Sequence, residues 1–376
     1  MRNQSKRPVL IDLFAGVGGM SLGAARAGFD VRASVELDSI AMATHAVNFP
    51  NARHFSWDVA KTSGDRLLLE AGVVPGNLDG LIGGPPCQGF SNIGKRAIGD
   101  PRNSLFGHFF RLVRETKPRF FVAENVPGIL ADRNTSIVKD AIAQLPKNYV
   151  LLEAREISAH RLGAPTSRAR VFFIGYDPER MNSLNLDSLF LRPRRSMVTV
   201  GDALLGLPNV RSTWLSEEQG WRRVERLPTN NEFYRRVVNA IPSGVGNLEA
   251  IDRMRRFGEV SGSLGTQHTD TVIRRFANVR PGETDPISRA PRLAENGFCP
   301  TLRAGTGSER GSFQAVRPIH HRSPRVITPR EAARLQGFPD WFQFHGTKWH
   351  SFRQIGNSVS PIVAEALLTP IRNALA

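Results

Sequence analysis

The chain has 376 residues, of which 40% are hydrophobic and 22% are charged, and its formal net charge is +16. This composition excludes a disordered or fibrous protein, and the length predicts two domains, because a single hydrophobic core stops growing at about 250 to 300 residues. No apolar run approaches the roughly 18 residues that cross a bilayer, and the first residues carry no secretory signal, so we expect a cytoplasmic protein without a membrane partner.

Short apolar runs alternate with helical patterns through the first half of the chain. The predicted strands are Val9–Phe14, Val31–Glu36, Leu78–Ile82, Phe120–Ala123, Tyr149–Ala154 and Val171–Tyr176. The predicted helices are Met20–Ala27, Ile40–Asn48, Leu105–Glu115 and Ser136–Gln144. This alternation predicts an α/β fold with a parallel sheet covered on both faces. Ligands of such folds bind at the carboxyl ends of the strands, where the loops after Phe14, Glu36, Ile82 and Ala123 lie.

The periodicity weakens from about residue 182, where Pro, Gly and Arg become frequent. Val198–Leu205 and Leu248–Phe257 have helical patterns, whereas Val279–Gly282 and Gly305–Ser312 are typical of loops. An amphipathic helix over Asn357–Ala374 is predicted to follow a turn at Gln354-Ile355-Gly356. We therefore predict a first domain of residues 1–181 plus 347–376 and a second, smaller and irregular domain of residues 182–346.

Charge and cysteine usage indicate the kind of partner and of chemistry. A charge of +16 favours a polyanion, most commonly nucleic acid. Most of the basic residues are arginines, which pair bidentately with phosphates and guanine edges. A GC-rich genome would produce the same arginine bias, so the total charge is the stronger argument. The two cysteines, Cys87 and Cys299, have no metal-ligand spacing and form no disulfide framework, and we expect no metal.

A glycine-rich loop, Asp12-Leu13-Phe14-Ala15-Gly16-Val17-Gly18-Gly19, follows the first predicted strand and opens a helix. Its backbone N–H groups can approach a ligand closely. Glu36, 20 residues after Gly16, ends the next strand, where a carboxylate can accept hydrogen bonds from ribose hydroxyls. Asp58 is suited either to an adenine amino group or to capping a helix at Val59. The dinucleotide fingerprint lacks its third glycine because position 21 is serine, which favours S-adenosyl-methionine over a nicotinamide cofactor.

Cys87 lies in Gly83-Gly84-Pro85-Pro86-Cys87-Gln88-Gly89-Phe90-Ser91, a stretch that two prolines exclude from helix and regular strand. A cysteine is more often buried and inert than reactive. This one follows a strand on the same predicted rim as the glycine-rich loop, and neighbouring arginines and loop N–H groups can lower a thiol pKa from about 8.5. The Pro-Pro-Cys-Gln context therefore favours a nucleophile.

Six ordered blocks resemble the DNA (cytosine-5) methyltransferases of bacterial restriction-modification systems. They are Phe14–Gly19, Gly84–Ser91, Glu124-Asn125-Val126-Pro127-Gly128, Arg168-Ala169-Arg170-Val171-Phe172, Thr328–Pro339 and Gln354–Val359. They cover most of the first half and the last fifty or so residues. The resemblance implies a Rossmann-like, S-adenosyl-methionine-dependent methyltransferase domain for residues 1–181 plus 347–376. It implies a target-recognition domain for residues 182–346.

The resemblance also implies catalytic roles. Cys87 would add to C6 of a cytosine flipped out of the duplex, which makes C5 nucleophilic toward the methyl group. Glu124 would hydrogen-bond the N3 and amino edge, Arg170 would hold the O2 edge, and Arg168 would support the loop or a phosphate. Taken singly, Glu124 is better explained as a helix N-terminal carboxylate, and Arg168 and Arg170 as ordinary surface charges. Their position on the same predicted rim as Cys87 favours the catalytic roles. The group that removes the C5 proton is not identified, and water is the default.

The cofactor residues that the resemblance implies lie in five segments. They are Phe14, Ala15, Gly16, Gly18 and Gly19; Glu36 and Leu37; Asp58 and Val59; Pro85; and Asn357, Ser358 and Val359. The family often has Gln where this chain has Thr166, and Ala and Pro where it has Ser358 and Ser360. These departures put single contacts in doubt.

DNA contacts are expected from Gln88 and Ser91, which would fill the vacated position or steady the backbone, and from Arg303 and Arg310. The last two belong to the Arg-rich candidate reading loop Thr301–Ser312, where each would address a guanine or a phosphate. This loop lacks the Gly-Lys-[Ser/Thr] ending of a phosphate loop. His320, His321, His345 and His350 invite a zinc hypothesis, but without cysteines at finger spacing we expect histidines of the surface or the DNA backbone.

The leading hypothesis is a monomeric enzyme that methylates C5 of cytosine in a specific double-stranded DNA sequence. It would act beside a separate restriction endonuclease or alone, in the bacterial cytoplasm and in association with the nucleoid. The alternatives are an RNA (tRNA) cytosine-5 methyltransferase with the same Pro-Pro-Cys-Gln loop, a catalytically silent DNA-binding relative and, more distantly, a nicotinamide-dependent dehydrogenase.

Overall fold

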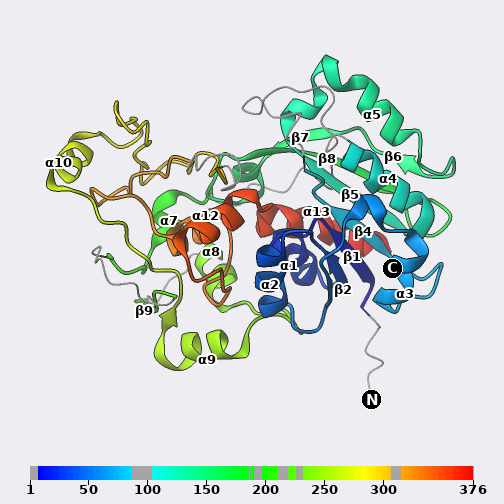
Figure 1. Cartoon of the computed structure of the whole chain (residues 1–376), viewed down its shortest axis with the longest axis horizontal. Coiled ribbons are helices and arrows are strands. Elements are labelled where there is room, and N and C mark those ends of the chain that lie inside the picture. Colours follow the sequence, from blue (N-terminus) through cyan, green and yellow to red (C-terminus); the bar gives the residue numbers. More distant parts are fainter. Residues whose placement is uncertain are drawn as a thin grey trace.

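The computed structural model describes residues 7–86, 104–185, 187, 189, 197–210, 219–225, 232–305 and 315–375. A mixed sheet forms the centre of the predicted first domain (Figure 1). Its strands are β1 (Val9–Leu13), β2 (Asp30–Val35), β3 (Arg53–Phe55), β4 (Gly80–Gly83), β5 (Phe120–Asn125), β6 (Val150–Leu151), β7 (Arg155–Ser158) and β8 (Ala169–Tyr176). The order is β3-β2-β1-β4-β5-β8-β6, and β7 also pairs with β8.

The α/β prediction is confirmed, but the expectation of an all-parallel sheet is wrong. Strands β3, β2, β1, β4 and β5 are parallel, whereas β8 runs antiparallel to β5, β6 and β7. A parallel connection needs a crossover of about a dozen residues or more, usually through a helix. Between β7 and β8 the chain forms only the short 3-10 helix η5 (Ala159–Leu162), so β8 returns antiparallel.

Helices cover both faces of the sheet because the strand side chains alternate between two hydrophobic clusters. Along β5, Phe120 and Val122 join one cluster and Phe121 and Ala123 the other. The helices of the predicted first domain are α1 (Gly19–Arg26), α2 (Ser39–Asn48), α3 (Gly64–Ala71), α4 (Ser104–Thr116), α5 (Thr135–Ile142), α12 (Lys348–Asn357) and α13 (Pro361–Ala374), with 3-10 helices η1 (Val59–Lys61), η3 (Pro127–Leu130) and η4 (Asp132–Asn134). None of the helices in the described ranges has the length and apolarity needed to pass through a bilayer.

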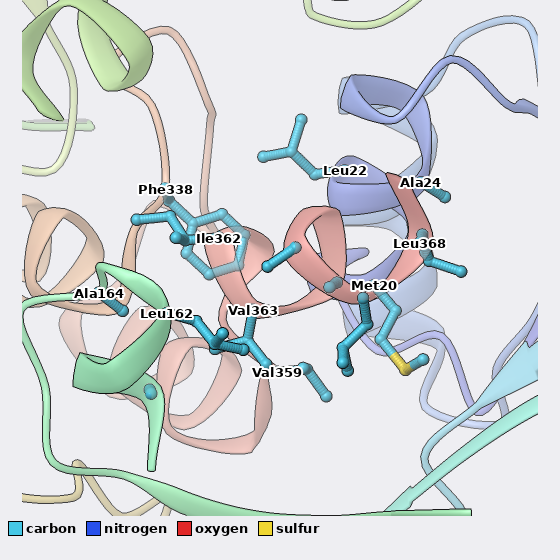
Figure 2. Packing of buried hydrophobic residues seen from close by; sticks show 14 of the residues in the cluster. Met20, Leu22, Ala24, Leu162, Ala164, Phe338, Val359, Ile362, Val363 and Leu368 are labelled. Atoms are coloured by element: carbon cyan, nitrogen blue, oxygen red, sulfur yellow. The ribbon is translucent and has the colours of Figure 1, made fainter. Parts of the chain in front are cut away.

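The C-terminal segment returns to the first strands, as predicted, but in two helices. Gln354, Ile355 and Gly356 lie inside α12, and the break comes at residues 358–360, so the predicted turn is wrong. Helix α13 packs against α1 (Figure 2). A Cβ placed on Gly23 of α1 would lie only 2.4 Å from Cβ of Ala364, so glycine permits this close approach.

The second region contains short elements joined by long irregular segments, as its texture predicts. They are α7 (Val200–Leu204), β9 (Arg222–Arg223), α8 (Glu232–Tyr234), the π-helix η6 (Arg235–Asn239), α9 (Leu248–Phe257), β10 (Glu259–Val260), α10 (Asp270–Asn278) and α11 (Pro329–Gln336). The predicted helices at α7 and α9 are confirmed, and α10 and α11 were not predicted. One buried cluster includes residues of both regions, such as Leu10 and Trp341. The domain division at residues 181 and 346 stays a proposal.

Two buried arginines of α11 form hydrogen bonds to several other segments of the second region. Arg334 binds Asp340 through two hydrogen bonds of 2.7 and 2.6 Å and also donates to the carbonyl of Leu205. Arg330 donates to the carbonyls of Ser261 and Phe342. Because burying a charge without partners is very costly, these contacts fix α11 between the segments around it.

Candidate active site

The candidate site lies where three parallel strands end side by side. Leu13 of β1 is paired with Gly83 of β4, and Gly83 is paired with Ala123 of β5. The glycine-rich loop, the Pro85-Pro86 segment and Glu124 therefore begin at one edge of the sheet, as the predicted topology requires.

Glu124 and Arg170 form an ion pair at this edge. The Nε atom of Arg170 lies 2.7 Å from Oε1 of Glu124, and the two side chains are only 15% and 11% exposed. They come from the antiparallel neighbours β5 and β8, which bring position 124 opposite 172. Glu124 thus lies in a strand and not at a helix N-terminus, and Arg170 is not an ordinary surface charge. Water is largely excluded from the pair, which strengthens its electrostatic interaction.

The segment that leads to Cys87 lies against this ion pair. A Cβ on Gly84 would be 3.1 Å from Oε2 of Glu124, so the backbone passes directly beside the carboxylate. The side-chain amide of Asn125 donates to the carbonyl of Pro85 at 3.4 Å. Asn125 is therefore a supporting residue whose role the sequence did not reveal, although it stands inside a recognised block. Cys87, Gln88 and Ser91 lie outside the described residues.

Arg168 is buried at the entry to β8. Its Nη1 donates to the carbonyl of Leu302 at 3.1 Å, and its exposed fraction is 4%, so the surface interpretation is wrong. The hydroxyl of Thr166 and the backbone N–H of Ser167 both donate to the carbonyl of Cys299 at 2.9 Å. The entry to β8 is thus fixed to segment 299–302 of the second region. This long-range contact has no local sequence signal.

The glycine-rich loop has the strained backbone of a ligand-binding turn. Phe14 has a φ of 56°, and Gly16 and Gly18 have φ values of 55° and 95°, in the left-handed region that favours glycine. Glu36 holds this loop, because its carboxylate accepts from the N–H of Gly16 at 2.9 Å and from that of Asp38 at 2.8 Å. Burial raises the pKa of Glu36, and these two hydrogen bonds oppose the shift. Leu37 beside it is 67% exposed.

The predicted C-terminal cofactor residues lie beside the same loop. A Cβ on Gly19 would be 2.2 Å from the carbonyl oxygen of Val359, so only glycine fits there. Ser358 is fixed by a hydrogen bond to its carbonyl from the amide of Gln336 and by another from its own hydroxyl to the carbonyl of Gln354. Asn357 is the last residue of α12, and Ser358 and Val359 begin the short connection to α13.

Asp58 caps η1 by accepting from the N–H of Ala60 at 3.0 Å, as one interpretation predicted, and Val59 is buried. The turn is held from α4 by Arg111, a residue that the sequence did not single out. Arg111 donates to the carbonyls of Val59 and Thr62 at 2.9 Å and binds Glu115, which in turn accepts from the N–H of Gly64.

A hydrogen-bond chain that no local sequence pattern predicts lies beneath the glycine-rich loop, from Asp12 through Ser21 and His45 to His54. Ser21 donates to Asp12 at 2.6 Å, Nε2 of His45 lies 3.0 Å from the Ser21 oxygen, and Nδ1 of His45 lies 3.0 Å from Nε2 of His54. Burial raises the pKa of Asp12 to about 7 and lowers that of His45 well below its ordinary value. We assign His45 as the neutral donor to Ser21. Cβ on Gly18 would lie 2.9 Å from the His45 ring.

The remaining predicted residues are two arginines and the histidines. Arg303 is exposed, and Arg310 lies outside the described residues. His320 and His321 are buried, which corrects the expectation of surface histidines. Nδ1 of His320 accepts from the N–H groups of Arg322 and Ser323, so it holds a turn. Within the described ranges, no group of three or more His, Cys, Asp or Glu is placed to hold a metal ion.

Comparison with known proteins identifies the family. The model of the C-5 cytosine-specific DNA methylase family matches residues 9–373. Type II methyltransferase M.XorII of Xanthomonas oryzae pv. oryzae is 43% identical over 372 residues, which are 98% of this chain and 85% of the relative. Type II methyltransferase M.DdeI of Desulfomicrobium norvegicum is 32% identical over 388 residues, covering 95% of this chain and 87% of the relative.

Solved structures agree with this result. The crystal structure of a protein assigned as a DNA modification methyltransferase encoded within an E. coli prophage superposes with a TM-score of 0.88 at 47% identity, over 98% of this chain and 99% of that one. The S. pombe Dnmt2 methyltransferase, with a TM-score of 0.60 and 16% identity over 97% and 98% of the two chains, shares the fold. The chain therefore belongs to the C-5 cytosine-specific DNA methylase family and is a DNA cytosine methyltransferase.

Proposed function

We propose that the protein transfers a methyl group from S-adenosyl-methionine to C5 of a cytosine that is flipped out of a specific duplex sequence, through a covalent bond between Cys87 and C6. The observation that carries the proposal is the buried Glu124–Arg170 pair directly beside the Gly84-Pro85 backbone. A carboxyl group and a guanidinium at this spacing match the N3/amino edge and the O2 of one pyrimidine. The nucleophile follows two residues after Pro85.

The residues of the glycine-rich rim fit the proposed cofactor. S-adenosyl-methionine supplies an electrophilic methyl group on a sulfonium. The space that a Cβ on Gly16 would enter is open, with no heavy atom within 4 Å, so a ligand can lie against this backbone. Glu36 would accept from the ribose hydroxyls, Asp58 from the adenine amino group, and exposed Leu37 would cover the ring. Phe14, Ala15, Gly18, Gly19, Val59, Pro85 and Asn357, Ser358 and Val359 would line the rest.

The chain's own residues then account for the base chemistry. In the free protein Glu124 is the anionic partner of Arg170. When the base binds, Glu124 takes up a proton from solvent and Arg170 turns to hold O2. The Cys87 thiolate then adds to C6 while Glu124 donates its proton to N3 and accepts from the amino group, which neutralises charge on the ring. Arg168 keeps the entry to β8 fixed to Leu302. After methyl transfer, loss of the C5 proton to water, return of the N3 proton to Glu124 and elimination of the Cys87 thiolate restore the enzyme. Flipping costs a few kcal/mol, which DNA contacts must offset.

The DNA partner and its context are inferred from the relatives and the charge. The type II relatives and the +16 charge support double-stranded DNA as substrate and action at the nucleoid. The proposal also includes a separate restriction endonuclease in the same cell and a monomeric enzyme. Arg303 and Arg310 are proposed to contact bases or phosphates of the target, and Gln88 and Ser91 the vacated position.

A transfer assay tests the proposal. Labelled methyl groups from S-adenosyl-methionine should enter duplex DNA, and bisulfite sequencing of DNA from cells that express the chain should show one methylated sequence. Transfer RNA that accepts methyl groups better than duplex DNA would favour the alternative RNA methyltransferase. Failure of every cytosine-containing duplex to accept methyl groups would contradict the proposal.

Replacing Arg111 with alanine should weaken cofactor binding, because the turn at Asp58 loses the hydrogen bonds to Val59 and Thr62. We expect the Kd of S-adenosyl-homocysteine to rise about tenfold, which corresponds to about 1.4 kcal/mol. Isothermal titration calorimetry measures this change, and kcat at saturating cofactor should change little. Exposed Arg114 on the same helix is the matched control. Equal effects of R111A and R114A would reject the positioning role.

A further inference from the structure

A shallow hollow lies where the second region meets α12. Segments 302–304 and 315–317 form two of its walls, and Trp349 and Phe352 of α12 form the third.

Arg317 stacks on an aromatic ring and has no anionic partner among the residues that the structure describes. Its guanidinium carbon lies 4.0 Å from the centre of the Phe352 ring, a stacked cation–π arrangement. No hydrogen bond or ion pair joins its N–H groups to an acceptor in the described part of the chain. A guanidinium has five N–H donors in a planar fork, so the stacked group keeps its edge available for an incoming acceptor.

The charge around the hollow is positive. Arg303 is exposed at its rim, and none of the lining residues is acidic. Lys348 lies near enough that Arg317 adds to the lowering of its pKa, which burial mainly causes. Its Nζ donates to the carbonyl of Gly265 at 2.7 Å. Such a cluster of cations attracts an anion.

The hollow lies close to the residues that are proposed to bind the flipped cytosine. Leu302, which lines it, accepts the hydrogen bond of Arg168, two residues before Arg170. Arg303 and Ala304, which also line it, pack against Gly356 of α12, where a Cβ would lie 2.7 Å from the backbone N of Ala304. The hollow is therefore adjacent to the segment that supports the proposed cytosine-binding arginine.

We propose that Arg317, stacked on Phe352, binds a phosphate of the DNA backbone near the flipped cytosine and so fixes the register of the duplex at the catalytic edge. This inference rests on the proposed function. A recessed fork with an apolar floor suits a phosphate, which protrudes from the duplex and accepts bidentately, better than a base edge inside a groove. Arg317 is then a DNA-positioning residue that carries no sequence information.

The first test replaces Arg317 with glutamine, which keeps a planar polar head over Phe352 but removes the charge. A fluorescent duplex is titrated by anisotropy with saturating S-adenosyl-homocysteine, between about 50 and 200 mM salt. We expect about tenfold weaker binding of specific and unrelated duplexes alike, and a slope of log K against log salt that is smaller by about one. R317K keeps the charge and should retain the wild-type slope of log K against log salt. Thermal unfolding of R317K and R317Q shows whether each variant is folded.

The matched control is R256Q, which removes the same charge from α9 at a side chain that is 71% exposed. An R317Q slope equal to that of R256Q would overturn the inference. A loss confined to particular sequences would also overturn it, because it would indicate base reading.

A methylphosphonate scan identifies the partner atom. Neutralising the one phosphate that Arg317 contacts should weaken binding by the wild-type protein and leave R317Q unaffected. If every neutralised position weakens both proteins equally, Arg317 does not contact the backbone. Absence of methyl transfer to any duplex would instead count against the proposed function, so the two failures are distinguishable.

Discussion

Replacing Cys87 with serine is expected to reduce methyl transfer to duplex DNA by about a thousandfold or more. Only a thiolate is a good nucleophile near neutral pH, whereas the serine hydroxyl that replaces it is scarcely ionised and has no base assigned to it. The substitution exchanges one atom and leaves the double proline, the loop length and the Glu124–Arg170 pair in place. Affinity for DNA and for the cofactor should therefore change little, and the loss should appear in single-turnover transfer.

The chain offers a matched control in its second cysteine. Cys299 is fully buried, and burial raises the pKa of its thiol far above the ordinary value, so it is inert as a nucleophile. C299S should retain transfer within a few fold. A covalent adduct on 5-fluorocytosine DNA should form with C299S and not with C87S. Methylation by C87S at the normal rate would remove the basis of the proposed mechanism.

The sequence predicted the elements that build the catalytic edge because their signals are local. Apolar runs bounded by glycine or proline identified β1, β2, β4, β5 and β8. The switch to helical periodicity identified α1, α2, α4 and α5 between them, but not α3. Since β1, β4 and β5 are parallel neighbours, knowing where each ends was enough to place three loops at one rim. The direction of β8 could not be predicted from such local signals, because it depends on where in the sheet the chain returns after β7.

Other features depend on contacts between distant residues. The bond from Arg168 to Leu302 and the chain from Asp12 to His54 join elements that no local pattern connects. Helix α11 is different, because its start has a readable signal: Thr328 and Glu331 form a capping box around Pro329. The helix was not predicted because its buried residues include Arg330 and Arg334, and charged residues usually predict an exposed surface.

Replacing Glu124 with glutamine is expected to lower the single-turnover rate by about a hundredfold to a thousandfold, with less than about tenfold change in DNA affinity. Glutamine keeps the size of the side chain and can still hydrogen-bond the cytosine edge. It has no proton to transfer to N3, and it leaves Arg170 without its counter-charge in a site where both side chains are less than one-sixth exposed.

A second ion pair separates the catalytic effect from the loss of a salt bridge. Glu259 and Arg253, on β10 and α9, lie 2.9 Å apart with side chains 27% and 33% exposed. E259Q should lower thermal stability by an amount comparable with E124Q and leave the transfer rate unchanged. Equal rates for the two variants would reject the assigned role of Glu124.

The double variant E124Q/R170Q shows whether the two residues act together. If the pair binds opposite edges of one cytosine, each residue depends on the geometry that the other sets, and removing both should cost little more than removing one. Independent roles would instead make the two losses multiply. Rapid-quench transfer rates of the four proteins at saturating DNA and cofactor distinguish these results. A fully multiplicative outcome would mean that the 2.7 Å contact between Arg170 and Glu124 orients neither side chain for the base.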